Sequence, residues 1–282
     1  MKDADARLSG RIPRRFAKLA QEKKAGLVAF VTANDPSPEV FAEILAGLPG
    51  SGADVIEVGM PFSDPMADGP SIQASSERAL KFNTSLRDVL ASVAAFRRKD
   101  SDTPIILMGY YNPIYRMGGE VFAQAAVAAG VDGLIVVDLP PEESEELEVH
   151  LRPNGLSLIF LTAPTSDDKR LPTIVGRASG FVYYVAVAGI TGTKSAEESA
   201  VRDAVQRLRR HTKLPVAVGF GIRTPEAARA IAGHCDAAVV GSAIVDVIAR
   251  NLTADGNPTP GLAAKVLAFV KSLSDGVRGA RA

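Results

Sequence analysis

The amino-acid sequence predicts an α/β fold, a (β/α)₈ barrel with an extra helix before the first strand. Short runs rich in valine, isoleucine and leucine recur along the chain, and segments with helical periodicity separate them. None of these runs alternates strictly between apolar and polar residues, which is typical of parallel strands buried on both faces. Eight such runs within 282 residues favour a barrel, and a doubly wound sheet is the alternative.

The elements are expected in regular alternation within one domain, residues 1–282. Strands are predicted at residues 26–32, 54–59, 104–109, 133–138, 156–161, 181–185, 215–220 and 236–241. Helices are predicted at residues 11–22, 37–48, 75–98, 120–129, 142–151, 197–211, 225–232 and 260–272. The ends, residues 1–9 and 274–282, are expected to be flexible.

Composition restricts the possible functions. The 32 basic and 32 acidic side chains cancel, and this neutrality disfavours a nucleic-acid-binding protein. Hydrophobic residues make up 46% and charged residues 23%, which is ordinary for a soluble globular protein. The sequence shows no apolar run long enough for a membrane span and no apolar segment after its charged first residues. We therefore expect a cytoplasmic protein with neither nucleic acid nor membrane as a partner.

Glycines follow three consecutive predicted strands, at the edge where a barrel carries its active site. Glycine allows a ligand to approach the backbone, and the N–H groups at a helix start attract anions. The pattern therefore indicates a phosphate site, with tight turns between strand and helix as the structural alternative. The residues are Gly189 and Gly192 after the sixth strand, Gly219 and Gly221 after the seventh, and Gly241 and Ser242 after the eighth.

Carboxylates near strand ends are the candidates for chemistry. Glu57 interrupts an apolar strand, where burial would raise its pKa and suit it to acid–base catalysis. The alternative is a structural carboxylate with a charged partner. Asp68 follows in a proline-rich loop, in which Asp64 fits a turn-forming role better. Asp138, at the end of the fourth predicted strand, fits either a site or a turn.

Other catalytic groups are poorly placed. The three histidines lie in or beside predicted helices, so they offer no clustered metal site. No lysine falls within a predicted strand, where a Schiff-base lysine would be expected. The single cysteine, Cys235, lies at a helix-to-strand junction and fits a buried structural role. Carboxylates, tyrosine hydroxyls and a phosphate cradle together suit proton transfer on a phosphorylated small molecule, without metal or covalent catalysis.

Residues 56–70, IEVGMPFSDPMADGP, resemble the signature of the tryptophan synthase alpha subunit family. Similarity continues at residues 30–32, 108–115, 138–140 and 219–221, and extends over about residues 10–252. The resemblance implies a lyase of tryptophan biosynthesis, which cleaves indole-3-glycerol phosphate to indole and glyceraldehyde 3-phosphate. It also implies an α2β2 heterotetramer with a beta subunit. This chain would hold no cofactor, whereas the beta subunit would use pyridoxal phosphate to condense indole with L-serine.

The resemblance assigns roles to individual residues. Glu57 and Asp68 correspond to the two catalytic carboxylates: Glu57 would protonate indole C3 and deprotonate the glycerol hydroxyl, and Asp68 would interact with the ring N–H. Substrate contacts fall on Phe30, Tyr110, Tyr183, Thr191 and Phe220. Phosphate contacts fall on Gly192, Gly221, Gly241 and Ser242. The partner interface falls on Pro61, Asp64, Asn112 and Pro140.

Three alternatives remain open from the sequence. The chain could be another phosphate-binding barrel enzyme, such as an isomerase or epimerase, although the context of Glu57 and Asp68 argues against this. It could be a stand-alone lyase that releases free indole without a partner. It could also be a non-catalytic activator of a beta subunit, which is disfavoured because both carboxylates are present. Formation of indole distinguishes these possibilities.

Overall fold

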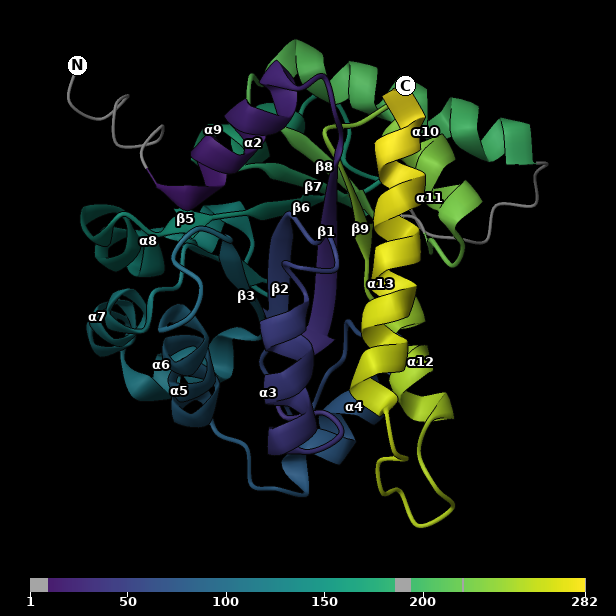
Figure 1. The fold of residues 1–282 in the computed structure, drawn as a ribbon. Helices are drawn as coiled ribbons and strands as arrows, with labels where there is room; N and C mark the ends of the chain where they lie inside the picture. The colour runs from purple at the N-terminus through teal and green to yellow at the C-terminus, as the bar shows by residue number, and fades with distance from the viewer. Residues whose placement is uncertain (1–9, 186–193, 220, 282) are drawn as a thin grey trace.

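The computed structural model describes residues 10–185, 194–219 and 221–281, and it confirms the predicted barrel of parallel strands surrounded by helices (Figure 1). The strands are β1 (Gly26–Thr32), β2 (Val55–Gly59), β3 (Ile105–Gly109), β4 (Gly133–Val136), β5 (Ser157–Leu158), β6 (Phe160–Thr162), β7 (Val182–Val185), β8 (Val216–Gly219) and β9 (Ala237–Val240). They pair in the order β5-β4-β3-β2-β1-β9-β8-β7-β6. Every pairing in this sheet is parallel.

Helices connect and cover these strands. They are α2 (Arg11–Gln21), α3 (Pro38–Gly47), α4 (Pro70–Leu80), α5 (Leu86–Arg97), α6 (Tyr111–Met117), α7 (Gly119–Ala129), α8 (Glu145–Leu151), α9 (Leu171–Arg177), α10 (Lys194–His211), α11 (Pro225–Ala232), α12 (Ser242–Arg250) and α13 (Leu262–Arg278). Short 3₁₀ turns are η1 (Pro141–Glu143), η2 (Arg152–Asn154) and η3 (Gly279–Arg281). Across the described ranges, no helix combines the length and the apolar character needed to cross a membrane.

The fifth predicted strand is divided into β5 and β6. The barrel closes at this division. β5 pairs with β4, whereas β6 pairs with β7. Between them, the Ile159 amide still donates to the Leu134 carbonyl at 2.8 Å, and the Ile159 side chain is buried. The two short strands therefore act as one bent strand in an eight-membered barrel.

The amino end of the barrel is filled by apolar side chains. Ile12, Phe16 and Leu19 lie on one face of α2 because their spacing follows the helical repeat. They pack with inward-facing strand residues, and the Phe16 and Phe181 ring centroids are 5.6 Å apart. In Figure 1, α2 lies across the top of the barrel, whereas α4 lies at the opposite end. The extra predicted helix therefore closes the amino end of the barrel.

The alternation of side chains along each strand separates the barrel interior from the layer beneath the helices. In β2, Val55 belongs to the interior cluster, whereas Ile56 and Val58 belong to the layer under the helices. The period of two therefore turns Glu57 inward as well. All five β2 residues are buried, which explains why the sequence shows an apolar run rather than polar alternation.

One predicted helix is wrong, because residues 75–98 do not form a continuous helix. α4 ends at Leu80 and α5 begins at Leu86, with Asn83 in the left-handed backbone region between them (φ 55°). Ser85 and Asp88 form a capping box that starts α5. The helix-start signal at Ser85 therefore begins a second helix, although the apolar periodicity predicted a single one.

The C-terminal segment, predicted to be flexible over residues 274–282, is helical in its described part. α13 continues to Arg278, and η3 extends to Arg281. The Arg278 guanidinium donates to both Asp54 carboxylate oxygens at 2.8 Å and to the Ala25 carbonyl at 2.8 Å. Val277 is buried against the core. These contacts anchor the helix end that its glycine and arginine content had suggested would be loose.

We expect Gly276→Ala to destabilise the fold even though alanine is the better helix former. Helix propensity alone would favour alanine by about 1 kcal/mol. A Cβ atom at Gly276, however, would lie 2.2 Å from the Pro225 carbonyl oxygen, where α13 packs on α11. Overpacking typically costs about 1–3 kcal/mol. Thermal unfolding should therefore show a lower Tm.

Gly176→Ala is the matched control. Gly176 lies in α9, is exposed, and has open space around its Cβ position. This substitution should leave the Tm unchanged or raise it, because only the propensity effect remains. Equal Tm changes for the two variants would contradict the close-packing explanation.

Candidate active site

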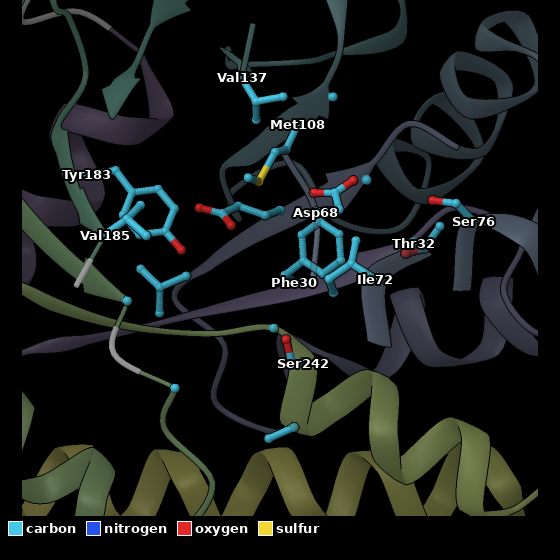
Figure 2. Close-up of a pocket in the computed structure, with 18 of the residues that line it drawn as sticks. Phe30, Thr32, Asp68, Ile72, Ser76, Met108, Val137, Tyr183, Val185 and Ser242 are labelled. Carbon is cyan, nitrogen blue, oxygen red and sulfur yellow. The ribbon is translucent and has the colours of Figure 1, made fainter. Parts of the chain in front are cut away.

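A cavity of about 340 Å³ opens at the carboxyl ends of the strands, where barrel enzymes carry their sites. Figure 2 shows Tyr183 on one side of this cavity and Phe30 and Asp68 on the other, with Ser242 below them. The carboxylate of Glu57 also lines it. Residues far apart in the sequence therefore meet because the parallel strands deliver their carboxyl ends to the same rim.

Glu57 is the most unusual group in the cavity. Its side chain is buried, and neither carboxylate oxygen has a hydrogen-bond partner among the described residues. Burial raises its pKa to about 8, because an ionised carboxylate loses its hydration in this position. The group is therefore mostly protonated at neutral pH. The sequence alternative of a structural carboxylate with a charged partner finds no such partner in the described part of the chain.

Tyr183 lies beside Glu57 on the inward face of β7. Burial raises the pKa of its hydroxyl well above the ordinary value, and the nearby Glu57 charge adds to the effect. The ring fits there because β8 carries glycine at its end. A Cβ atom at Gly219 would lie 2.7 Å from the tyrosine hydroxyl oxygen. Tyr183 therefore stays neutral and narrows the cavity next to the buried acid.

Asp68 reaches the cavity from the loop that follows β2. Burial raises the pKa of its carboxyl group, and a hydrogen bond with Tyr110 partly opposes this effect. The Tyr110 hydroxyl also accepts the Ala67 N–H at 2.9 Å, and its ring stacks on Phe62 with centroids 5.2 Å apart. Tyr110 was expected at the substrate, but it contacts the Asp68 segment and is absent from the cavity lining.

The loop that carries Asp68 is fixed to α4, the helix that starts two residues later. The Gln73 amide nitrogen donates to the Asp68 carbonyl at 2.9 Å. α4 is held in turn against the end of β1, where the Thr32 and Ser75 hydroxyl oxygens are 2.6 Å apart. Arg78 donates two hydrogen bonds to the buried Asp35 carboxylate, at 2.6 and 2.9 Å. The position of Asp68 therefore depends on the contact between β1 and α4.

Part of the residue set predicted to bind phosphate lines the cavity. Gly221, Gly241 and Ser242 all line it. Gly241 is the N-cap of α12, and its carbonyl accepts the Ile244 and Val245 amides at 2.9 and 3.1 Å. The preceding N–H groups at the helix start have no partner within the helix and carry the positive end of its dipole. This geometry suits an anion, as the sequence indicated.

Four expected ligand residues lie outside the described residues. They are Gly189, Thr191 and Gly192 in the sixth loop and Phe220 after β8. The four residues expected at a partner interface are described, and none of them lines the cavity. Asp64, Asn112 and Pro140 are exposed, and Pro61 is half-buried. All four follow the carboxyl ends of β2, β3 and β4.

Sequence reasoning did not identify several lining residues. The alternation of side chains along strands would have identified some of these lining residues. They lie two residues from a predicted site residue, or at the matching position of a neighbouring strand. Thr32, Met108, Val137, Val185 and Val239 belong to this group. Ile72 and Ser76 come from α4, and Arg223 comes from the loop after β8. No sequence pattern distinguished these last three residues.

The other candidate catalytic residues, Asp138 and Cys235, have structural roles. The Asp138 carboxylate accepts the Tyr111 amide at 2.8 Å at the start of α6, so it acts at the turn. Cys235 is buried, and burial raises the pKa of its thiol to about 12. Within the described ranges, no three His, Cys, Asp or Glu side chains form a group that could hold a metal ion.

The fold and the site define a class of protein: a (β/α)₈ barrel whose cavity at the carboxyl ends of the strands is lined by a buried carboxyl group and by glycines next to a helix start. Residues 16–275 match the family described as "Tryptophan synthase alpha chain". A protein of Caulobacter vibrioides with that name is 55% identical over 271 residues, which covers 96% of this chain and 97% of the relative. The chain therefore belongs to the tryptophan synthase alpha chain family.

Solved structures give the same result. A "tryptophan synthase subunit alpha" from Legionella pneumophila superposes with a TM-score of 0.88 at 38% identity, over 96% of this chain and 99% of that one. A chain from "tryptophan synthase from M. tuberculosis" in an open form has a TM-score of 0.84 at 32% identity, over 96% of this chain and 99% of that chain. The similarity extends over nearly the whole length in each case.

The raised pKa of Glu57 predicts a specific pH dependence of stability. Between its ordinary pKa of 4.5 and its folded value of about 8, the folded chain binds a proton that the unfolded chain releases. Glu57 therefore lowers the free energy of unfolding as pH rises through this window. Each unit of pKa difference changes the folding equilibrium by about tenfold.

Glu57→Gln removes this titration while keeping the shape of the side chain. Urea unfolding at pH 5 and pH 8 should show that the variant gains stability relative to the unchanged protein as pH rises. Glu43→Gln, at an exposed position of α3, is the control and should give a constant difference. A Glu57→Gln difference that does not vary with pH would contradict the raised pKa that burial gives Glu57.

Proposed function

We propose that the chain cleaves indole-3-glycerol phosphate to indole and glyceraldehyde 3-phosphate. The observation that carries this proposal is the buried Glu57, which has no hydrogen-bond partner among the described residues and lines the same cavity as Gly221, Gly241 and Ser242. A protonated carboxyl group can donate a proton to a bound substrate, and the cradle can hold the substrate's phosphate at a distance from it. Membership of the tryptophan synthase alpha chain family supports this choice of substrate.

The reaction needs an electron sink, and the indole ring can supply one. Glu57 protonates C3 of the indole while the lone pair of the ring nitrogen forms the C2–N double bond. The ring becomes an electrophilic indolenine, and its N–H proton either passes to the Asp68 carboxylate or stays on the ring beside it. The Glu57 carboxylate then takes the proton of the adjacent glycerol hydroxyl. The bond between C3 and the glycerol carbon breaks, its electrons restore the indole, and the former hydroxyl carbon becomes the aldehyde. Glu57 ends protonated, and Asp68 returns to the ring nitrogen any proton that it accepted, so protons balance over the cycle.

Asp68 has a complementary role in this scheme. Its carboxylate interacts with the indole ring N–H, as proton acceptor or as stabiliser of the positive charge that develops on the ring. Its pKa is raised by burial but is restrained by the hydrogen bond with Tyr110. Two carboxyl groups in different surroundings can thus divide acid and base work.

Other residues would contact the indole ring and the phosphate of the substrate. Phe30 and Tyr183 would contact the indole, together with Phe220. Gly221, Gly241 and Ser242 would bind the phosphate through backbone N–H groups, together with Gly192. Thr191, in the sixth loop, would also contact the substrate.

We also propose a beta subunit as partner, in a cytoplasmic α2β2 heterotetramer. The indole would pass to that subunit, where pyridoxal phosphate would support condensation with L-serine, while this chain holds no cofactor. The partner surface would include Pro61, Asp64, Asn112 and Pro140. Two large apolar side chains near them support this surface, because Met66 is 81% exposed and Tyr115 is 62% exposed.

The direct test measures indole after incubation of the purified chain with indole-3-glycerol phosphate, with and without a beta subunit. Slow formation of indole alone and faster formation with the partner would support the proposal. Fast release without a partner would instead favour a stand-alone lyase. No indole in either case, from folded protein, would reject the reaction and favour an isomerase, an epimerase or a non-catalytic activator.

Glu57→Gln should lower kcat for indole formation by at least about a hundredfold, because acid–base groups typically contribute 10²–10⁴-fold. Asp68→Asn should also lower kcat, since the amide cannot take a proton or stabilise positive charge. Glu43→Gln serves as a control for an exposed carboxylate and should retain activity. Near-normal turnover by folded Glu57→Gln protein would rule out the proposed proton transfer.

Asn112→Arg should weaken stimulation by the beta subunit without changing activity in its absence. The side chain is exposed near the start of α6 and does not line the cavity. Loss of a well-packed interface contact raises the half-saturating concentration of partner by about fivefold or more. Gln124→Arg adds the same side chain at an exposed position of α7 and should have no such effect. Equal titration curves for both variants would exclude Asn112 from the interface.

A further inference from the structure

The described cavity lining offers little positive charge for a phosphorylated ligand. The two carboxyl groups, Glu57 and Asp68, line it together with mostly apolar side chains. A phosphate ester adds about 1.5–2 negative charges at pH 7. Among the described lining residues, a single basic side chain is present, that of Arg223. Its position is therefore relevant to how the ligand's charge is compensated.

Arg223 lies next to the cradle and is held in place by a carboxylate. It follows Gly221 by two residues in the loop between β8 and α11. Its Nη1 atom is 2.6 Å from an Asp246 carboxylate oxygen on α12, the helix whose first turn forms the other part of the cradle. The Arg223 side chain is 60% exposed and that of Asp246 is 24% exposed. Arg223 therefore lines the cavity with a side chain that contacts one carboxylate and is still largely exposed.

Asp246 is itself connected to a third element. Burial would raise its pKa, but hydrogen bonds from Ser71 and Arg223 lower it below the ordinary value. Ser71 lies in the first turn of α4, three residues after Asp68. The ionised Asp246 thus links the loop after β8, the helix start of α12 and the segment that carries Asp68.

We propose that Arg223 is a phosphate-binding residue of this site, which supplies the full positive charge that the glycine cradle lacks. This inference rests on the proposed function, because it takes the phosphate to lie at Gly221, Gly241 and Ser242. Backbone N–H groups and a helix start provide only partial charges. A guanidinium adds a full charge and several donors that match phosphate oxygens. Asp246 orients that guanidinium before the ligand arrives.

The test compares a phosphorylated probe with an unphosphorylated one. Glycerol 3-phosphate contains the anion without the ring, whereas indole contains the ring without the anion. Arg223→Gln should raise the KM for indole-3-glycerol phosphate and the inhibition constant of glycerol 3-phosphate by about three- to tenfold, in keeping with a partly exposed ion pair. The inhibition constant of indole and kcat should not change. Arg223→Lys should restore part of the affinity, since it keeps the charge but loses the planar donors.

Two further variants separate a charge effect from a structural one. Asp246→Asn keeps the positive charge and removes a competing negative one, so glycerol 3-phosphate should bind equally well or more tightly. If the ion pair only fastened the loop to α12, Asp246→Asn and Arg223→Gln would weaken both probes alike. Arg210→Gln removes the same charge from an exposed position of α10 and should leave both probes unaffected.

Calorimetric binding of glycerol 3-phosphate keeps this inference separate from the proposed reaction, because it needs no turnover. If the unchanged protein makes no indole but binds glycerol 3-phosphate more tightly than Arg223→Gln does, the reaction fails and the phosphate assignment of Arg223 stands. If indole forms and Arg223→Gln has unchanged KM and unchanged glycerol 3-phosphate affinity, the assignment of Arg223 is overturned and the reaction stands.

Discussion

In a barrel of parallel strands, side chains fill the inside and helices cover the outside, so both faces of every strand are buried. The chemistry of this site depends on that burial. An inward-facing side chain near the carboxyl end of a strand is surrounded by its neighbours on the adjoining strands. In the pairing of β1 with β2, Phe30 lies opposite Glu57. Glu57 is therefore dry without needing any special hydrophobic pocket. Its high pKa follows from the architecture rather than from a neighbouring charge.

The same constraint explains which parts of the fold were readable in the sequence. Strands buried on both faces appear as apolar runs, so β1 matches its predicted limits and the other strands differ by a few residues. The break within the fifth strand was not visible, because Leu158, Ile159 and Phe160 continue the apolar run across it. The sequence analysis predicted no helix at α6 or α9, each of which has seven residues.

Site residues were predictable to the extent that a strand position or a family signature identified them. Glu57 was conspicuous as a charge within an apolar strand, and the glycines after β8 and β9 marked a place for an anion. Arg223 carried no such signal, because an arginine in a turn usually points to solvent. Its relevance depends on the spatial relation between the β8–α11 loop and α12, which are separated by a whole strand and helix in the sequence. Contacts of this kind are recognised only in the three-dimensional structure.

The two carboxyl groups of the site are held in mechanically different ways. Glu57 projects from a strand that is hydrogen-bonded on both sides, so its position and its desolvation are fixed together. Asp68 lies on a loop whose placement depends on α4, and α4 depends on contacts with Thr32 and Asp35 at the end of β1. An acid that must be protonated before the substrate binds benefits from the rigid, dry position. A group that responds to charge developing on the substrate can tolerate partial solvent and a hydrogen bond from Tyr110. The division of labour proposed for the two residues therefore follows the division between strand and loop.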